Sequence, residues 1–132
     1  MDFSETHIGD YDLKSVEGLR ELQVLMLSHT RVTDAGLKHV ERLTELRTLR
    51  IDDTRLTDAG LEHVKGLVRL EFLQLSSTRI TDTGLKQIGK LPELCSLGVA
   101  DTRITDEGLK YLKGLTQLEQ LFAWGTKVTP SG

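Results

Sequence analysis

The side chains that could do chemistry in this chain stand in columns, in which equivalent residues recur every 24 positions. One column contains His29, Asp53, Ser77 and Asp101. His29, Asp52 and Asp53 offer an imidazole and two carboxylates, which are groups that bind divalent metals. No fixed ligand spacing accompanies them. Solvated loop residues are therefore the favoured interpretation, and no metal site is predicted.

Catalysis and cofactor binding find no support in the motifs. The chain has no glycine-rich phosphate loop, no serine with a histidine and an acid around it, and no carboxylate pair in an evidently apolar setting. Cys95 and His29 stand about three repeats apart, too far for a catalytic dyad. The sequence therefore predicts no enzyme activity, no catalytic residue and no cofactor.

A basic column is the most regular charge pattern in the sequence. Its members are Arg31, Arg55, Arg79, Arg103 and Lys127. A parallel acidic column stands three residues further on, at Asp34, Asp58, Asp82 and Asp106. Because like charges at a short interval repel, we expect the two columns to interleave as a structural ladder. A phosphate-binding stripe is the alternative.

These columns exist because one unit of 24 residues is repeated along the chain. A strict register is typical of a stacked solenoid, since each coil presents the same side chain to the same place in the next. The residues that show it most clearly are Thr30, Thr54, Thr78, Thr102 and Thr126. We predict a single domain over 1–132, with a worn first repeat at 1–21, repeats at 22–45, 46–69, 70–93 and 94–117, and a partial last repeat at 118–132.

Each unit combines a strand with a short helix. Leu25 and Leu27 alternate with polar or variable neighbours, as on a strand, whereas Leu37, Val40 and Leu43 follow the three-residue steps of a short helix. The strands are expected near 1–4, 24–28, 48–52, 72–76, 96–100 and 120–124. The helices are expected near 10–17, 34–42, 58–66, 82–90 and 106–114.

The turn into each helix carries a repeated threonine, aspartate and glycine. Thr33 is the expected helix N-cap, and Asp34 lies favourably in the positive first turn. Gly36 is expected to let this turn lie close against the next coil, where a Cβ atom would clash.

The runs LRELQVLMLSHTRVTDAGL and LPELCSLGVADTRITDEGL resemble the leucine-rich repeat family. Their TDxGL form is similar to bacterial repeat proteins and to the ribonuclease-inhibitor-like subtype. The resemblance covers nearly the whole chain and implies an α/β right-handed solenoid, with a parallel concave sheet and short convex helices, used mostly to hold other macromolecules. Thr30 and its equivalents stand where the family most often has Asn, so hydroxyl groups, with water, are expected to build the loop ladder.

Composition narrows the class of partner. The net charge of −3 gives no reason to expect nucleic acid or an anionic membrane. No apolar run of membrane-span length and no secretion signal is present. The single cysteine, Cys95, excludes an internal disulfide and fits a reducing compartment, which favours a cytoplasmic location.

The last repeat departs from the pattern. Ala123 replaces a large aliphatic residue, Pro130 replaces the repeated aspartate, and no polar cap is recognisable. We expect either a segment of a longer protein or open ends that another chain covers.

The concave strand face is the expected binding surface. Phe72, Phe122 and Trp124 are expected to point outward from it, with a shallow hollow formed between them by the small residues of the fourth repeat. Acidic residues outnumber basic ones on this face, which favours a basic partner with an apolar anchor. For Phe122 and Trp124, contact with a following repeat or cap is the alternative. The expected contact residues are Met26, Arg50, Asp52, Asp53, Phe72, Gln74, Ser96, Gly98, Ala100, Asp101, Phe122 and Trp124.

The sequence thus predicts a protein-protein interaction module that binds a protein or peptide on its concave face, as part of a larger protein. The alternative is a structural or engineered repeat scaffold that self-associates, as a homodimer, through its open ends. Neither interpretation involves nucleic acid or a membrane.

Overall fold

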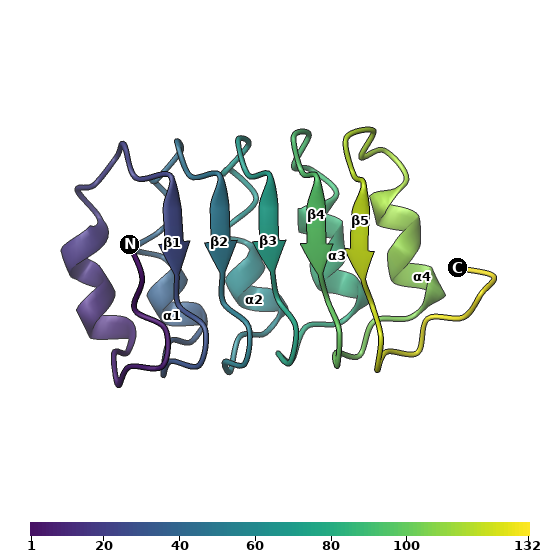
Figure 1. Cartoon of the computed structure of the whole chain (residues 1–132), viewed down its shortest axis with the longest axis horizontal. Coiled ribbons are helices and arrows are strands. Elements are labelled where there is room, and N and C mark those ends of the chain that lie inside the picture. Colours follow the sequence, from purple (N-terminus) through teal and green to yellow (C-terminus); the bar gives the residue numbers. More distant parts are fainter.

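The computed structural model describes residues 1–132 and shows a row of coils, each with one strand and one helical segment (Figure 1). The strands form one parallel sheet in sequence order: β1 (Val24–Met26), β2 (Thr48–Arg50), β3 (Phe72–Gln74), β4 (Ser96–Gly98) and β5 (Gln120–Phe122). Leu25 pairs with Leu49, and Leu49 pairs with Leu73. The 24-residue repeat of the sequence is therefore the register of the sheet.

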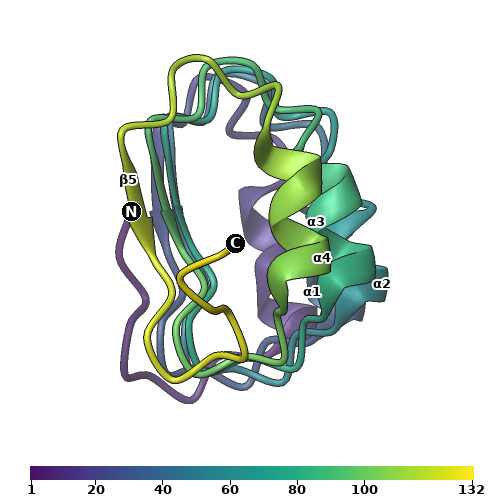
Figure 2. The same cartoon turned by 90° about the vertical axis from the view of Figure 1, so that its right-hand side faces the viewer.

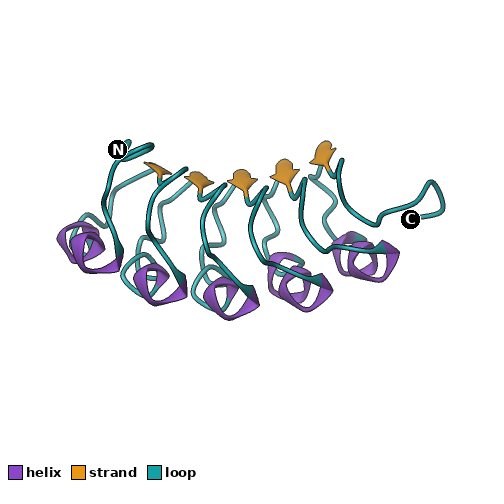
Figure 3. Cartoon of the chain, turned by 90° about the horizontal axis from the view of Figure 1, so that it is seen from below, coloured by secondary structure: helices purple, strands orange, loops and turns teal.

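The helices cover the opposite side of the core. They are the α-helices α1 (Asp34–Leu37), α2 (Asp58–Leu61), α3 (Asp82–Ile88) and α4 (Asp106–Leu109), with the 3₁₀ helices η1 (Asp10–Val16) and η2 (Lys110–Leu112). Figure 3 shows the strands on the inner, concave side of a shallow arc and the helices on the outer, convex side. The chain is thus an α/β solenoid, as its repeats predict. No helix has the length and apolar character needed to cross a membrane.

Most helices are shorter than predicted. The helix expected at 34–42 ends at Leu37, and beyond it the amide of Val40 donates to the Leu37 carbonyl, three residues back. The apolar residues of this segment stand three apart, which fits the three-residue turn of a 3₁₀ helix better than the α-helical turn. The positions of the helical segments were therefore predicted correctly, but the α-helices are shorter than predicted.

The strand predicted at 1–4 is absent, so the sheet has five strands instead of six. This segment forms one isolated bridge, between Asp2 and Met26. Phe3 is half-buried and packs against the core, whereas Met1 is 46% exposed. The first segment thus keeps the core contact of Phe3 but too little of the ladder to form a strand, while Leu13 and Val16 further along the worn repeat are buried.

One continuous core of 28 buried residues runs through the coils, between sheet and helices. Figure 2, a view along the row, shows these two layers on either side of it. Within one column, Leu25, Leu49 and Leu97 are fully buried and Leu73 is 2% exposed. Leu121 belongs to the same column in the last coil and is 39% exposed. Burial of a column residue therefore depends on a coil on each side.

The Thr-Asp-x-Gly motif joins each coil to the next. Asp34 accepts hydrogen bonds from the Thr57 amide (2.8 Å) and the Thr57 hydroxyl (2.5 Å). Gly60 lies against the same carboxylate, because a Cβ atom there would stand 2.5 Å from Oδ1 of Asp34. The close approach predicted for the repeated glycine is thus confirmed, but it is made to the preceding coil and not to the next one, because the aspartate of the preceding coil lies there. The equivalent hydrogen-bonded pairs are Asp10–Thr33, Asp58–Thr81, Asp82–Thr105 and Asp106–Thr129.

This arrangement overturns the predicted ladder of arginines and aspartates. Asp58 accepts both donors of Thr81 and forms no ion pair with the basic column. The threonine is the N-cap of each α-helix as predicted, but only Thr57 and Thr105 accept a hydrogen bond from their own helix, at 3.3 and 3.2 Å. The hydroxyl is occupied instead by the aspartate of the preceding coil.

The other repeated threonine acts within its own coil. The Thr30 hydroxyl donates to the Leu27 carbonyl (2.7 Å), and Thr78 donates to Leu75 in the same way (2.6 Å). The expected ladder of hydroxyl groups between coils is therefore wrong. Each threonine closes a sharp turn whose preceding residue has a positive φ, 55° at His29.

Candidate binding surface

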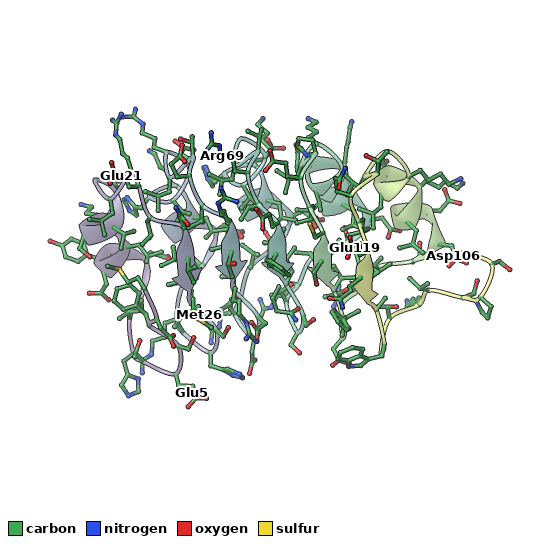
Figure 4. The ribbon with its side chains drawn as sticks, turned by 45° about the horizontal axis from the view of Figure 1, so that its top comes forward. Glu5, Glu21, Met26, Arg69, Asp106 and Glu119 are labelled. Carbon is green, nitrogen blue, oxygen red and sulfur yellow. The ribbon has the colours of Figure 1, made fainter.

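The concave face consists of rows of side chains that cross the strands. Residues two apart on a strand share a face, and parallel pairing aligns them with their equivalents on the next strand. Figure 4 shows Met26 on this face, Glu21 and Arg69 at the edge where the strands begin, and Glu5 at the edge where they end. One row comprises Val24, Thr48, Phe72, Ser96 and Gln120, and the next comprises Met26, Arg50, Gln74, Gly98 and Phe122.

A shallow hollow of about 380 Å³ lies in the middle of the concave face. Its lining residues are Met26, Thr48, Arg50, Phe72, Leu73, Gln74, Ser96 and Gly98. Six of the twelve expected contact residues therefore surround one hollow. Thr48 was not predicted, although its place in the row of Phe72 follows from the 24-residue register alone.

The hollow is not the one expected on the fourth repeat. Gly98 is buried because the side-chain amide of Gln74 lies over it, where a Cβ atom would be. Ala100 is 1% exposed and is inaccessible to a partner. The depression is therefore centred on β2, β3 and β4, with Gln74 covering part of the fourth repeat.

Hydrogen bonds hold the Gln74 side chain in this position. The Ser76 hydroxyl donates to Oε1 of Gln74 (2.6 Å), and the amide of Ala100 donates to the Ser76 hydroxyl (3.0 Å). These contacts connect β3 with β4 and fix one wall of the hollow before any partner arrives.

Several acidic residues of the face are paired within it. Glu71 forms an ion pair with Arg47 (2.6 Å). Asp52 accepts a hydrogen bond from the buried Ser28 hydroxyl (2.5 Å) and lies 3.5 Å from Nε of Arg50. That contact is an ion pair only, since Nε of Arg50 makes no hydrogen bond. The two acids in the central part of the face are thus each matched by an arginine, so they leave no excess negative charge there.

Unpaired negative charge lies towards the last coils. Asp101 and Glu119 form no ion pair and are exposed, and Figure 4 shows Glu119 beside β5. Asp53 pairs with His29 through Nδ1 (2.5 Å). Asp53 and Asp101 belong to the turns after the strands and do not line the hollow. Unpaired carboxylates that could attract a basic group therefore lie beside β5.

The aromatic residues stand on both sides of β4. Phe72 is 47% exposed on β3, whereas Phe122 and Trp124 lie in the last coil with Trp124 63% exposed. The rings of Phe122 and Trp124 meet edge to face, with centroids 5.7 Å apart and an interplanar angle of 76°. Strands two apart lie about 10 Å from each other. One short segment could therefore reach both aromatic sites.

The chemistry of the remaining candidate groups is limited. The structure contains no group of three or more His, Cys, Asp or Glu side chains that could hold a metal ion. Burial raises the pKa of the half-buried Cys95 thiol, and the nearby Glu71 and Glu119 raise it further. A thiol with a raised pKa is mainly protonated at neutral pH and is a poor nucleophile.

Comparisons with known proteins point to one family. Residues 70–89, which make up most of one unit, match the family model described as Leucine Rich repeat. A comparison with curated proteins gives no match.

Similar solved structures share the fold. Internalin C2 from Listeria monocytogenes has a TM-score of 0.77 and 23% identity, over 88% of this chain and 48% of that chain. The internalin inlF from the same species has a TM-score of 0.57 and 20% identity, over 96% of this chain and 48% of that one. PEPR1-AtPEP1 has a TM-score of 0.67 and 17% identity, over 97% of this chain and 18% of that one. This chain thus spans about half the length of each internalin. The match over residues 70–89 and the shared fold support the resemblance to the leucine-rich repeat family that the 24-residue register indicates.

Proposed function

We propose that this protein is an interaction module that binds a protein or peptide segment on its concave face. The observation that carries the proposal is the exposure of Phe72, Phe122 and Trp124 on a face whose other groups are largely fixed by internal contacts. Large exposed aromatic side chains are common anchors at interfaces, because they bury much area at a small entropic cost. Repeat solenoids commonly use their extended concave surface for binding.

The partner should combine an apolar anchor with positive charge. The hollow beside Phe72 is open and shallow, so an aliphatic or aromatic side chain could enter it without rearrangement of the sheet. Asp101 and Glu119 lie on the side of Phe122 and Trp124, where Lys or Arg of a partner would be attracted. A basic segment lying across the strands satisfies both requirements.

A displayed peptide library tests the proposal, because random peptides sample many possible partner segments at once. Peptides selected on the intact chain should be rich in Lys or Arg next to one large apolar residue. For a selected peptide, Phe72→Ala and Trp124→Ala should each weaken binding by about 2 kcal/mol or more. Tyr11→Ala is the matched control, because Tyr11 is 79% exposed on η1 and lies outside the face. Equal losses in all three variants, or selection of acidic peptides, would overturn the proposal.

Self-association through the last coil is a second candidate function. It is favoured by the exposure of Leu121, a core-column residue within strand β5, which pairs only with β4. An exposed strand edge beside apolar surface is a template for pairing with another chain. Analytical ultracentrifugation separates the two candidates. Self-association raises the average molar mass as the protein concentration rises, whereas a monomeric interaction module keeps the same molar mass.

A further inference from the structure

A second charged surface runs along the turns that follow the strands, at the lower edge of the molecule in Figure 1 and towards the viewer in Figure 3. Main-chain hydrogen bonds stack these turns, as the amide of Arg79 donates to the Leu56 carbonyl (2.9 Å) and that of Lys127 to the Ile104 carbonyl (3.0 Å). Coils joined in this way lie about 4.8 Å apart. We call the five exposed side chains of these turns the basic edge: Arg31, Arg55, Arg79, Arg103 and Lys127.

The cations of the basic edge have no partner within the chain. None of them takes part in an ion pair. Elsewhere, neighbouring coils pair their charges, as in Arg69–Glu45 (2.6 Å) and His63–Glu41 (2.9 Å). The acidic column that could neutralise the basic edge is hydrogen-bonded to threonines instead. Like charges at this spacing repel by roughly 1 kcal/mol per neighbouring pair in water, which an anionic ligand would relieve.

The basic edge borders a polar groove of about 810 Å³. Arg31, Arg55 and Arg79 line it, and no hydrophobic residue does. Asp53 and Asp101 also line the groove; Asp53 is paired with His29, so the three arginines face one unpaired carboxylate, that of Asp101. The other lining residues are Thr30, Thr33, Thr54, Ser77 and Thr78. Since the hydroxyls of Thr30, Thr54 and Thr78 donate to main-chain carbonyls, the guanidinium groups are the main free donors to a ligand.

We propose that the basic edge binds an acidic polypeptide segment. Guanidinium groups hold carboxylates through paired hydrogen bonds. A peptide in an extended conformation rises about 9 to 10 Å over three residues, close to the spacing of two coils. Acidic side chains three residues apart would therefore align with Arg31 and Arg79. The groove has no aromatic side chain on which bases could stack, which favours a peptide over a single-stranded nucleic acid.

Fluorescence anisotropy with a labelled oligoglutamate peptide tests this inference on the full chain. We expect binding that weakens as salt is added. The triple variant Arg31→Gln, Arg55→Gln, Arg79→Gln should reduce affinity at least about ten-fold, the sum expected for three exposed ion pairs. The matched control is Lys38→Gln, Lys86→Gln, Lys113→Gln, which removes the same charge from exposed side chains of the helical side and should change affinity less than two-fold, or about 0.4 kcal/mol. Circular dichroism checks that both variants are folded.

Three results would overturn the inference: no binding of oligoglutamate at low salt, equal losses in both triple variants, or tighter binding of a single-stranded oligonucleotide than of oligoglutamate. Trp124→Ala separates this surface from the concave face. It should leave oligoglutamate binding unchanged, so that failure of the concave-face proposal and failure of this one give different results.

Discussion

At the residue scale, one carboxylate per coil explains why Thr, Asp and Gly recur together. Asp58 receives the amide and hydroxyl of Thr81, at 2.7 and 2.5 Å, and lies where a side chain of residue 84 would otherwise be. The aspartate thus contacts the next coil, whereas the threonine and the glycine contact the aspartate of the preceding coil. The sequence showed the spacing and the close approach of the glycine. It could not show which donors the aspartate would receive, because the arginine and the threonine of the next repeat, Arg79 and Thr81, stand only two positions apart.

A double-mutant cycle tests this contact. Asp58→Ala should lower the free energy of unfolding by about 1 to 3 kcal/mol, since it removes a charged acceptor from two donors. Gly84→Ala should also destabilise by about 1 to 3 kcal/mol through overlap with the same carboxylate. The double variant should be destabilised by less than the sum of the two single effects, and the difference, which is the coupling energy, should be on the order of 1 kcal/mol. Urea denaturation supplies the measurement.

The cycle has matched controls. Gly66→Ala should be nearly neutral because no atom lies within 4 Å of the new Cβ, and Glu93→Ala should change stability by less than about 0.5 kcal/mol because Glu93 is exposed. Strict additivity of Asp58→Ala and Gly84→Ala would contradict the shared contact.

The acid titration of Asp106 tests the same contact in the last coil. The hydroxyl of Thr129, and then its amide, donate to this carboxylate and lower its pKa from the ordinary value. Because the folded-state pKa is lowered, the stabilisation is complete above an Asp pKa of about 3.9 and is lost as the pH falls through the folded-state pKa. Thr129→Val should move the pKa partly back upward, as followed by the carboxyl carbon NMR shift. Identical titration midpoints of Asp106 in the wild type and in Thr129→Val would exclude the Thr129 hydroxyl as the cause of the lowered pKa.

At the element scale, three-residue strands and one-turn helices are too short to be stable alone, so the stack of coils must stabilise them. Period-2 spacing placed the strands at β1 to β5, and three-residue spacing placed the helical segments. The sequence could not show that residues 1–4 form an isolated bridge instead of a strand, because a worn repeat keeps its apolar residues even where the main-chain hydrogen bonds of the sheet are lost. The hollow was also misplaced, because only the structure shows Gln74 over Gly98.

Truncation of a column leucine tests the dependence of each element on its neighbours. Leu73→Ala should destabilise by about 2 to 5 kcal/mol, because Leu73 is 2% exposed between two coils. Leu121→Ala removes the same atoms from a residue that is 39% exposed, so the loss should be clearly smaller. Thermal or urea unfolding of both variants supplies the comparison. Equal losses would show that burial between coils is not the source of stability.

At the scale of the whole molecule, the solenoid separates two surfaces of different character. The concave face carries exposed aromatic side chains with acidic residues towards β5, whereas the turns after the strands carry unpaired arginines. The residues of both surfaces could be predicted from the sequence, because the 24-residue period of a solenoid gives each residue its position on the molecule. The paired acids, such as Glu71 with Arg47, could not be distinguished from the unpaired Asp101, since pairing depends on side-chain reach between coils.

Sedimentation velocity over a wide concentration range tests whether the last coil joins two molecules. If Leu121 and the edge of β5 mediate self-association, the wild type should shift towards a dimer as its concentration rises, and Leu121→Lys should stay monomeric. Val68→Lys is the control, since Val68 is 48% exposed outside the last coil. A wild type that remains monomeric at all concentrations would exclude self-association through the last coil and leave the interaction module as the proposed function.

The central claim is that the concave face binds a partner, and NMR tests it most directly. The isotopically labelled chain would be titrated with a basic peptide selected from the displayed library. We predict that the largest amide shift changes occur at Phe72, Ser96, Phe122 and Trp124, whose residues surround the hollow and the aromatic pair, while Arg55 and the helices remain unchanged. Shift changes confined to the helices or to the turns of the basic edge would contradict the claim.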